Sequence, residues 1–350
     1  MTTTPLRVVV ATPLSDELAA LIERTEPRIE LVRDSSLLPP MRHPADHSGD
    51  PEFRRTPEQQ RRFERMLDTA DALYGIPDVD PAALARTVRA NPRLRWVQTM
   101  AAGGGGGIRA AALSQEELDR VLFTTSAGVH GGPLAEFALF GLLAGAKTLP
   151  RLTRQQRDHE WSGRWSMAQL GEQTVLVLGL GGIGAEVARL LAAFGTQVIG
   201  TSRHERPVGD VDEIVRPDGL IEAAARVDAV VVALPGTAST ANLLDEAFFS
   251  ALRPGTILVN VGRGSVIDEE SLLRALDDGR VGFAALDVTA VEPLPADSPL
   301  WDHPNVLISP HTAALNAGED RRIAELFADN ATRLLDGRAL RNRVDTVEFY

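Results

Sequence analysis

Short runs of apolar residues alternate along the chain with longer stretches in which apolar positions recur every three or four residues. The short runs have the length of buried strands, and the longer stretches have the period of amphipathic helices. In the first part of the chain, strands are expected at residues 6–11, 29–32, 72–74, 94–98 and 121–125. In the second part, strands are expected at residues 175–178, 197–201, 229–234, 256–261, 282–288 and 306–309. This alternation predicts an α/β fold of two doubly wound parallel-sheet domains.

A glycine-rich turn follows the expected strand at the start of the second part. Gly179, Gly181 and Gly184 have the spacing Gly-x-Gly-x-x-Gly. In that pattern the first glycine permits a tight turn, the second lets the backbone approach a pyrophosphate, and the third lets the helix pack on the strand. The N-terminus of the helix, which includes Gly182 and Ile183, directs unpaired N–H groups at the phosphates. The turn is therefore expected to bind a dinucleotide, and a merely structural glycine turn is the alternative.

The domain that contains the glycine-rich turn is expected as an insertion in the chain of the other domain. Residues 127–310 are predicted to form a Rossmann cofactor-binding domain. Residues 1–126 are predicted to form a substrate-binding outer domain, which the C-terminal helix in residues 311–350 completes. Two crossings between the domains suit a hinge that closes over a substrate.

Two stretches of the first domain break the pattern. Residues 37–56 are rich in proline and charge and are expected to form an irregular surface excursion, with a substrate lid as the alternative. His43 and His47 in this excursion are expected at the surface. The five consecutive glycines at residues 103–107 are either a mobile linker or a nest of backbone N–H groups that binds an anion.

Composition narrows the classes of function. The chain of 350 residues has a formal net charge of −12, which disfavours nucleic acid and anionic membranes as partners. It contains no cysteine, which excludes disulfides, thiolate catalysis and cysteine-ligated zinc, and no metal is expected. The N-terminal residues show no signal segment, and no apolar stretch is long enough to span a bilayer, so a cytoplasmic protein is expected.

Three residues suited to acid–base or anion chemistry follow expected strands of the second domain, namely Arg263, Glu292 and His311. Because ligands of an open parallel sheet bind beyond the carboxyl ends of its strands, these side chains are expected to converge on one cleft. A hydride that reaches a ketone builds negative charge on the oxygen, which a proton donor and a guanidinium stabilise. Taken singly, the three residues also fit a solvated turn, a surface charge and a helix cap.

Several pieces of sequence occur in a characteristic order, at residues 179–184, 234–240, 259–264, 286–295 and 309–312. With these pieces the chain resembles the D-isomer-specific 2-hydroxyacid dehydrogenase family over nearly its whole length. The resemblance implies an NAD(P)H-dependent reductase that converts small 2-keto acids, such as glyoxylate or hydroxypyruvate, to D-2-hydroxy acids. It also implies a homodimer, formed by the largely apolar helix from Pro133 and the loop with Trp161 and Trp165.

The resemblance further implies roles for individual residues. Arg263 would hold the carboxylate and carbonyl of the substrate, His311 would donate a proton to the ketone oxygen, and Glu292 would be the carboxylate partner of the histidine. Backbone N–H groups of Ala102 and Gly103 would contact the substrate carboxylate, which favours anion binding by the glycine run. Beyond the glycine turn, cofactor contacts are implied at Leu234, Pro235, Thr240, Val261, Asp287 and His311, with Asp287 on the nicotinamide amide.

The end of the second strand in the dinucleotide unit bears on the choice of cofactor. NAD-binding proteins of this fold place an acidic residue there, which binds the ribose hydroxyls. Because Ser202 stands at that place and Arg203 can pair with a phosphate, NADP(H) is expected to be preferred, with NAD(H) possible. The alternative is that Arg203 stacks beside adenine and serves both cofactors.

Two other functions stay open at this point. One is a 3-phosphoglycerate dehydrogenase-like oxidoreductase, which is disfavoured because no regulatory domain is expected before Tyr350. The other is a non-catalytic dinucleotide sensor, which the combination of Arg263, Glu292 and His311 disfavours.

Overall fold

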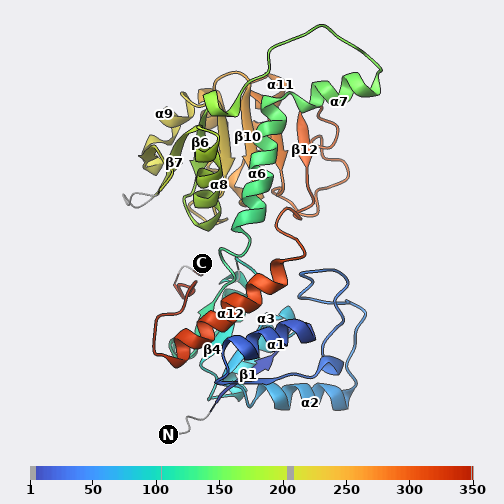
Figure 1. The fold of residues 1–350 in the computed structure, drawn as a ribbon, viewed down its shortest axis with the longest axis vertical. Coiled ribbons are helices and arrows are strands. Elements are labelled where there is room, and N and C mark those ends of the chain that lie inside the picture. Colours follow the sequence, from blue (N-terminus) through green and yellow to red (C-terminus); the bar gives the residue numbers. More distant parts are fainter. Residues whose placement is uncertain (1–4, 104, 203–208, 348, 350) are drawn as a thin grey trace. The chain divides into compact units, whose positions relative to one another are not determined.

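The computed structural model describes residues 5–103, 105–202, 209–347 and 349, which form two compact units (Figure 1). The first unit comprises Met1–His130 and Leu315–Tyr350, and the second comprises Gly131–Ala314. Each unit contains one parallel β-sheet, and the chain of the second is inserted into the chain of the first. The predicted α/β fold with an inserted second sheet is confirmed.

The first unit is built on a five-stranded sheet of order β2-β1-β3-β4-β5, in which all neighbouring strands are parallel. Its strands are β1 (Leu6–Val10), β2 (Ile29–Val32), β3 (Ala72–Tyr74), β4 (Trp96–Gln98) and β5 (Leu122–Thr124). Its helices are α1 (Asp16–Thr25), α2 (Pro57–Leu67), α3 (Pro81–Ala90), α4 (Gly105–Ala110), α5 (Gln115–Arg120) and α12 (Glu319–Leu335). A parallel sheet is buried on both faces, which explains why its central strands are almost entirely apolar.

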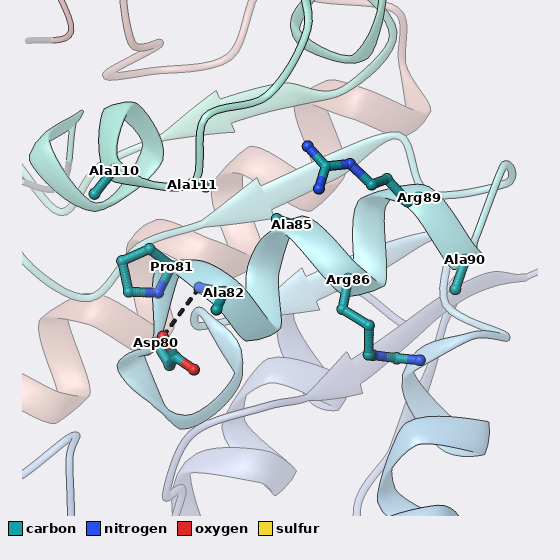
Figure 2. A pocket seen from close by; sticks show the side chains of 9 residues that line it. All are labelled: Asp80, Pro81, Ala82, Ala85, Arg86, Arg89, Ala90, Ala110 and Ala111. Carbon is teal, nitrogen blue, oxygen red and sulfur yellow. Dashed lines mark hydrogen bonds between the residues drawn. The ribbon is translucent and has the colours of Figure 1, made fainter.

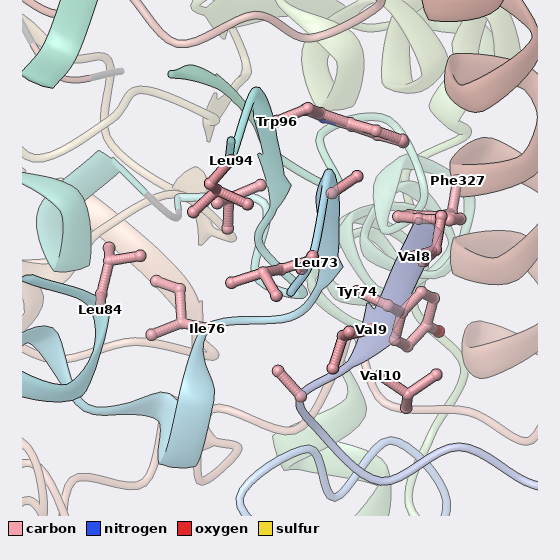
Figure 3. Close-up of a cluster of buried hydrophobic side chains, with 14 of the residues drawn as sticks. Val8, Val9, Val10, Leu73, Tyr74, Ile76, Leu84, Leu94, Trp96 and Phe327 are labelled. Carbon is pink, nitrogen blue, oxygen red and sulfur yellow. The ribbon is translucent and has the colours of Figure 1, made fainter. Parts of the chain in front are cut away.

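Phe327 on α12 ties the C-terminal helix into the core of the first unit (Figure 3). Its ring stacks on Trp96 with centroids 4.5 Å apart and meets Tyr74 edge-on at 5.1 Å. All three side chains are buried, and aromatic pairs of this kind contribute about 0.5–1.5 kcal/mol beyond the burial of their area. α12 also packs along α1.

The boundaries between the units lie slightly further along the chain than the sequence predicts. His130 stays with the first unit, because its Nε2 lies 2.9 Å from Glu319 Oε1. His311 stays with the second unit, because its N–H donates to Asp287 O at 2.9 Å.

The proline-rich excursion of the first unit forms no strand or α-helix before α2, in agreement with its predicted irregularity. His43 is exposed, as expected. The expectation for His47 is wrong, because its side chain is only 14% exposed and its Nε2 lies 3.7 Å from Glu319 Oε1. The first turn of α12 draws the excursion inward, since the N–H of Ala45 donates to Asp320 Oδ2 at 3.0 Å.

The second unit is built on a seven-stranded sheet of order β12-β11-β10-β9-β6-β7-β8, again parallel throughout. Its strands are β6 (Thr174–Leu178), β7 (Gln197–Thr201), β8 (Glu213–Val215), β9 (Ala229–Val232), β10 (Thr256–Asn260), β11 (Val281–Leu286) and β12 (Val306–Ile308). Its helices are α6 (Gly131–Ala146), α7 (Leu149–Arg157), α8 (Gly182–Ala193), α9 (Leu220–Ala224), α10 (Glu246–Ala251) and α11 (Glu269–Asp277). The sequence did not predict β8, because this half-buried edge strand lacks an apolar run.

α6 is the largely apolar helix that was expected from Pro133. It lies against β10 and β11 and packs beside α8, so its apolar residues are needed on several sides (Figure 1). A Cβ on Gly141 would lie 2.8 Å from Ala285 Cβ, so glycine permits the close approach of helix and sheet. Phe140 remains 48% exposed. Within the part of the chain that the structure describes, no helix is long and apolar enough to cross a bilayer.

Candidate active site

The turn between β6 and α8 has the geometry that a dinucleotide needs. Gly179 has a φ of 93°, a conformation that favours glycine, and its N–H donates to Thr201 Oγ1 at 3.0 Å. A Cβ on Gly184 would lie 1.9 Å from Gly179 O, so α8 can pack on the turn only with glycine there. A Cβ on Gly181 would meet nothing within 4 Å. The second glycine thus faces open space, as a turn that receives a pyrophosphate requires.

Further residues expected at the cofactor follow β9, which pairs with β6, and β10, which pairs with β9. Leu234 and Pro235 follow β9, and Thr240 Oγ1 donates to Pro235 O at 2.6 Å, which closes the loop. Val261 follows β10 and is buried, with its N–H bonded to the end of β9. The structure therefore places these residues at the carboxyl ends of adjacent strands, where ligands of such sheets bind.

Ser202, expected at the ribose, directly follows β7. Its N–H donates to Val215 O at 3.2 Å, which leaves the residue at the end of the strand next to the glycine turn. Arg203, expected to pair with a phosphate, lies outside the described residues.

His311 and Glu292 form a hydrogen-bonded pair at the ends of neighbouring strands. Glu292 follows β11 and His311 follows β12. His311 Nδ1 lies 2.7 Å from Glu292 Oε2, and the two side chains are 46% and 38% exposed. A carboxylate at Nδ1 fixes the orientation of the ring and leaves Nε2 free to face a ligand. The pair can therefore hold a proton on His311 Nε2 for transfer to a ligand.

Asp287 holds the segment that carries His311. The φ of His311 is 52°, a left-handed conformation that costs a non-glycine residue about 1–2 kcal/mol. Asp287 Oδ1 accepts hydrogen bonds from Ser309 Oγ at 2.7 Å and from the N–H groups of Thr312 and Ala313, both at 3.0 Å. The sequence suggested only a contact with the nicotinamide amide for Asp287. An acidic residue directly after a buried strand is the signal that could have pointed to this second role.

Arg263 lies in the turn after β10, the strand beside β11. Its side chain is exposed, and Nη1 donates to Gly262 O at 2.7 Å. Buried Asn260 holds the turn, since its Oδ1 accepts from the N–H of Gly262 at 3.0 Å and its Nδ2 donates to Arg263 O at 3.2 Å. A Cβ on Gly264 would lie 1.9 Å from Thr289 O, so this turn packs directly on the segment after β11. Sequence reasoning missed Asn260, although a polar residue at the end of an apolar strand is a recognisable signal.

Ala102 and Gly103, expected at the substrate carboxylate, lie in the first unit between β4 and α4. Gly105–Gly107 form the first turn of α4, so this part of the glycine run is helical and is not an extended linker. Completely buried Ile108 follows the glycines and anchors the helical turn in the core.

An open depression of about 930 Å³ in the first unit contains none of the expected site residues (Figure 2). It is lined by α3 and α4, largely by alanine side chains together with Arg86 and Arg89. Arg86 pairs with Asp68 at 2.7 Å and Arg89 pairs with Glu117 at 3.1 Å. Since both arginines already have carboxylate partners, the depression is no candidate for the acid–base site.

A glycine turn suited to a dinucleotide, in one sheet with a histidine–glutamate pair, defines a nicotinamide-dependent dehydrogenase. A family model described as "D-isomer specific 2-hydroxyacid dehydrogenase, NAD binding domain" matches residues 139–313. The chain belongs to the D-isomer-specific 2-hydroxyacid dehydrogenase family, and the resemblance seen in the sequence is confirmed.

Individual relatives agree with this assignment. Glyoxylate/hydroxypyruvate reductase B of Pectobacterium atrosepticum is 31% identical over 259 residues, which are 73% of this chain and 80% of that protein. D-3-phosphoglycerate dehydrogenase of Mycobacterium tuberculosis is 32% identical over 284 residues, which are 78% of this chain, and the match spans 53% of that longer protein. A solved structure is also similar, that of an NADPH-dependent glyoxylate/hydroxypyruvate reductase from Sinorhizobium meliloti in complex with NADP and sulfate. Its TM-score is 0.75 and its sequence identity is 26%, and the match covers 98% of this chain and 99% of that chain.

Proposed function

We propose that the protein reduces small 2-keto acids, such as glyoxylate or hydroxypyruvate, to D-2-hydroxy acids. The observation that carries the proposal is the 2.7 Å contact between His311 Nδ1 and Glu292 Oε2, in the same parallel sheet as the glycine turn. A bound nicotinamide cofactor supplies the hydride. His311 donates the proton on Nε2 to the ketone oxygen, which offsets the negative charge that develops there.

Arg263 is proposed to bind the carboxylate of the keto acid. The chain carries a formal net charge of −12, so an anionic substrate needs a local cation, and a guanidinium matches a carboxylate with two parallel hydrogen bonds. Asn260 and the glycines beside Arg263 fix the backbone from which this side chain extends. The proposed contacts of Ala102 and Gly103 with the carboxylate rest on the family resemblance alone.

NADPH is proposed as the preferred reductant. Ser202 supports this, because it leaves the end of β7 without an acidic residue to repel a 2′-phosphate. The reductase from Sinorhizobium meliloti, whose structure contains NADP, supports it independently.

A second candidate is the oxidation of 3-phosphoglycerate. The identity of 32% to the mycobacterial 3-phosphoglycerate dehydrogenase favours it, and both reactions would use the same histidine–glutamate pair. A non-catalytic dinucleotide sensor does not need a proton donor, so the histidine–glutamate pair disfavours that role.

A homodimer is also proposed, built on α6 and the segment that follows it. Large apolar side chains are exposed in this region, and Trp161 is fully exposed. The others are Phe140, Leu152 and Met167. Light scattering at micromolar concentration is expected to give twice the mass of the chain, and a monomer would refute the dimer.

The function is tested by following NADPH oxidation with a panel of 2-keto acids, which should include glyoxylate, hydroxypyruvate, pyruvate and phosphohydroxypyruvate. The proposal predicts the highest kcat/KM for one of the small keto acids without phosphate. A preference for phosphohydroxypyruvate would favour the second candidate. Tight cofactor binding without turnover of any keto acid would favour a sensor.

A further inference from the structure

The segment after β11 carries Glu292 but has little support of its own. Thr289 N–H donates to Glu292 Oε1 at 3.2 Å, and Thr289 Oγ1 donates to Val291 O at 2.9 Å. Val291 is 58% exposed, so the outer part of this turn is not anchored in the core. Contacts with other segments therefore add to the Thr289 hydrogen bond in holding the Glu292 carboxylate beside His311.

Two such contacts hold the turn from different elements. From β10, the absence of a side chain at Gly264 lets that backbone lie against Thr289 and Ala290, where a Cβ would be 1.9 Å from Thr289 C and 2.5 Å from Ala290 N. From α11, Glu269 Oε1 accepts a hydrogen bond from the N–H of Ala290 at 2.6 Å. A charged acceptor makes this a stronger bond than a neutral one would.

Glu269 is not committed elsewhere by an ion pair. Among the residues that the structure describes, no arginine, lysine or histidine pairs with its carboxylate, whereas the adjacent Glu270 lies 4.0 Å from Arg274. Glu269 is half-buried and Glu270 is exposed. The first turn of α11 therefore offers one carboxylate to the turn that carries Glu292 and a neighbouring one to solvent.

We propose that Glu269 is a positioning residue for the reaction, which acts on His311 through Ala290 and Glu292. By fixing the N–H of Ala290, it keeps the Glu292 carboxylate at His311 Nδ1 and so keeps the imidazole oriented for proton transfer. This inference rests on the proposed function, because it assigns Glu269 a part in supplying the proton to the ketone.

Two substitutions separate the effect of the length of the Glu269 side chain from the effect of its charge. Glu269→Gln keeps an oxygen at the same distance along the side chain and removes the charge, whereas Glu269→Asp keeps the charge and shortens the side chain by one methylene. If Glu269 positions the turn, Glu269→Gln keeps most of the wild-type activity and Glu269→Asp is impaired more. If Glu269 only places a negative charge at the N-terminus of α11, the order is reversed. Glu270→Asp is the matched control and is expected to resemble wild type.

The expected loss in Glu269→Asp is about tenfold in kcat at neutral pH, with the affinity for NADPH unchanged. The KM for the keto acid is expected to stay near the wild-type value, because the turn that carries Arg263 keeps its own backbone support from Asn260. A purely structural role of Glu269 would lower the melting temperature without lowering the kcat of the folded protein. Unchanged kcat in Glu269→Asp would overturn the proposal.

A second measurement does not depend on turnover. The environment of the His311 ring is followed by proton NMR of the full-length protein, with the signal assigned by its loss in His311→Gln. The proposal predicts a changed chemical shift of the ring protons in Glu269→Asp but not in Glu270→Asp, and identical spectra would overturn it. A changed chemical shift in a protein that reduces no 2-keto acid would support the positioning role and refute the proposed function.

Discussion

Alanine at Gly181 and alanine at Gly184 are expected to have different effects, although both belong to the same turn. In Gly184→Ala the new Cβ would lie 1.9 Å from Gly179 O, and a backbone oxygen there cannot move without shifting α8 on β6. Overpacking of this kind costs about 1–3 kcal/mol, which lowers the melting temperature of a unit of this size by about 2–12 °C. In Gly181→Ala the Cβ meets nothing, and the φ of −76° suits alanine, so stability is expected to stay unchanged.

The methyl group of Gly181→Ala would instead occupy the space through which a pyrophosphate approaches the turn. The loss of one charge-assisted hydrogen bond from the backbone is worth about 1.5–3 kcal/mol, or about a ten- to a hundredfold loss of cofactor affinity. Thermal unfolding without cofactor and fluorescence titration with NADPH measure the two effects separately. Gly132→Ala, where the added Cβ also meets nothing within 4 Å, is the control. NADPH affinity of wild-type strength in Gly181→Ala would refute the assignment of this turn to the pyrophosphate.

Other variants test the acid–base pair, the substrate anchor, the cofactor choice and the effect of pH on stability. His311→Gln is expected to lower kcat by about 10²–10⁴-fold with unchanged NADPH affinity, and near-wild-type turnover would exclude it as the proton donor. Arg263→Ala is expected to raise KM for the keto acid as well as to lower kcat in steady-state assays. Ser202→Asp is expected to shift the ratio of kcat/KM values toward NADH, and a wild type that already prefers NADH would contradict the argument. The hydrogen bond from Arg28 lowers the pKa of Glu26 from 4.5 to about 2, so this carboxylate stabilises the fold above about pH 4.5 and the effect is lost as pH falls through about 2. Because Arg28 is partly exposed, Glu26→Gln is expected to cost only about 1–2 kcal/mol at pH 7 in denaturant titrations, and a cost that does not shrink toward pH 2 would contradict the linkage.

Local signals in the sequence were sufficient for every strand of the two sheets except β8, and for the glycine turn and the histidine–glutamate pair. The spacing of Gly179, Gly181 and Gly184 reflects steric needs within one turn, so it predicts the geometry that the structure contains. His311 and Glu292 could be expected near each other because both follow strands of one parallel sheet. The register of those strands is what brings their side chains into hydrogen-bonding distance.

Features that depend on contacts between distant segments could not be predicted. The burial of His47 depends on Glu319, which belongs to a helix near the other end of the chain. The helical turn of Gly105–Gly107 depends on the place that Ile108 finds in the core, because glycine itself has a low helix propensity. The hydrogen bond from the N–H of Ala290 to Glu269 joins two different elements, so no local sequence pattern indicates it. The periodicity of apolar residues indicates which face of a helix or strand is buried, but not which other element packs on that face.

The handedness of the product is the sharpest test of the proposed reaction. Wild-type protein is incubated with NADPH and pyruvate or hydroxypyruvate, and the hydroxy acid formed is separated by chiral chromatography. The proposed reaction predicts the D-isomer alone, with formation of the product strongly reduced in His311→Gln. Formation of the L-isomer or of a racemate, or undiminished product with the His311 variant, would contradict it.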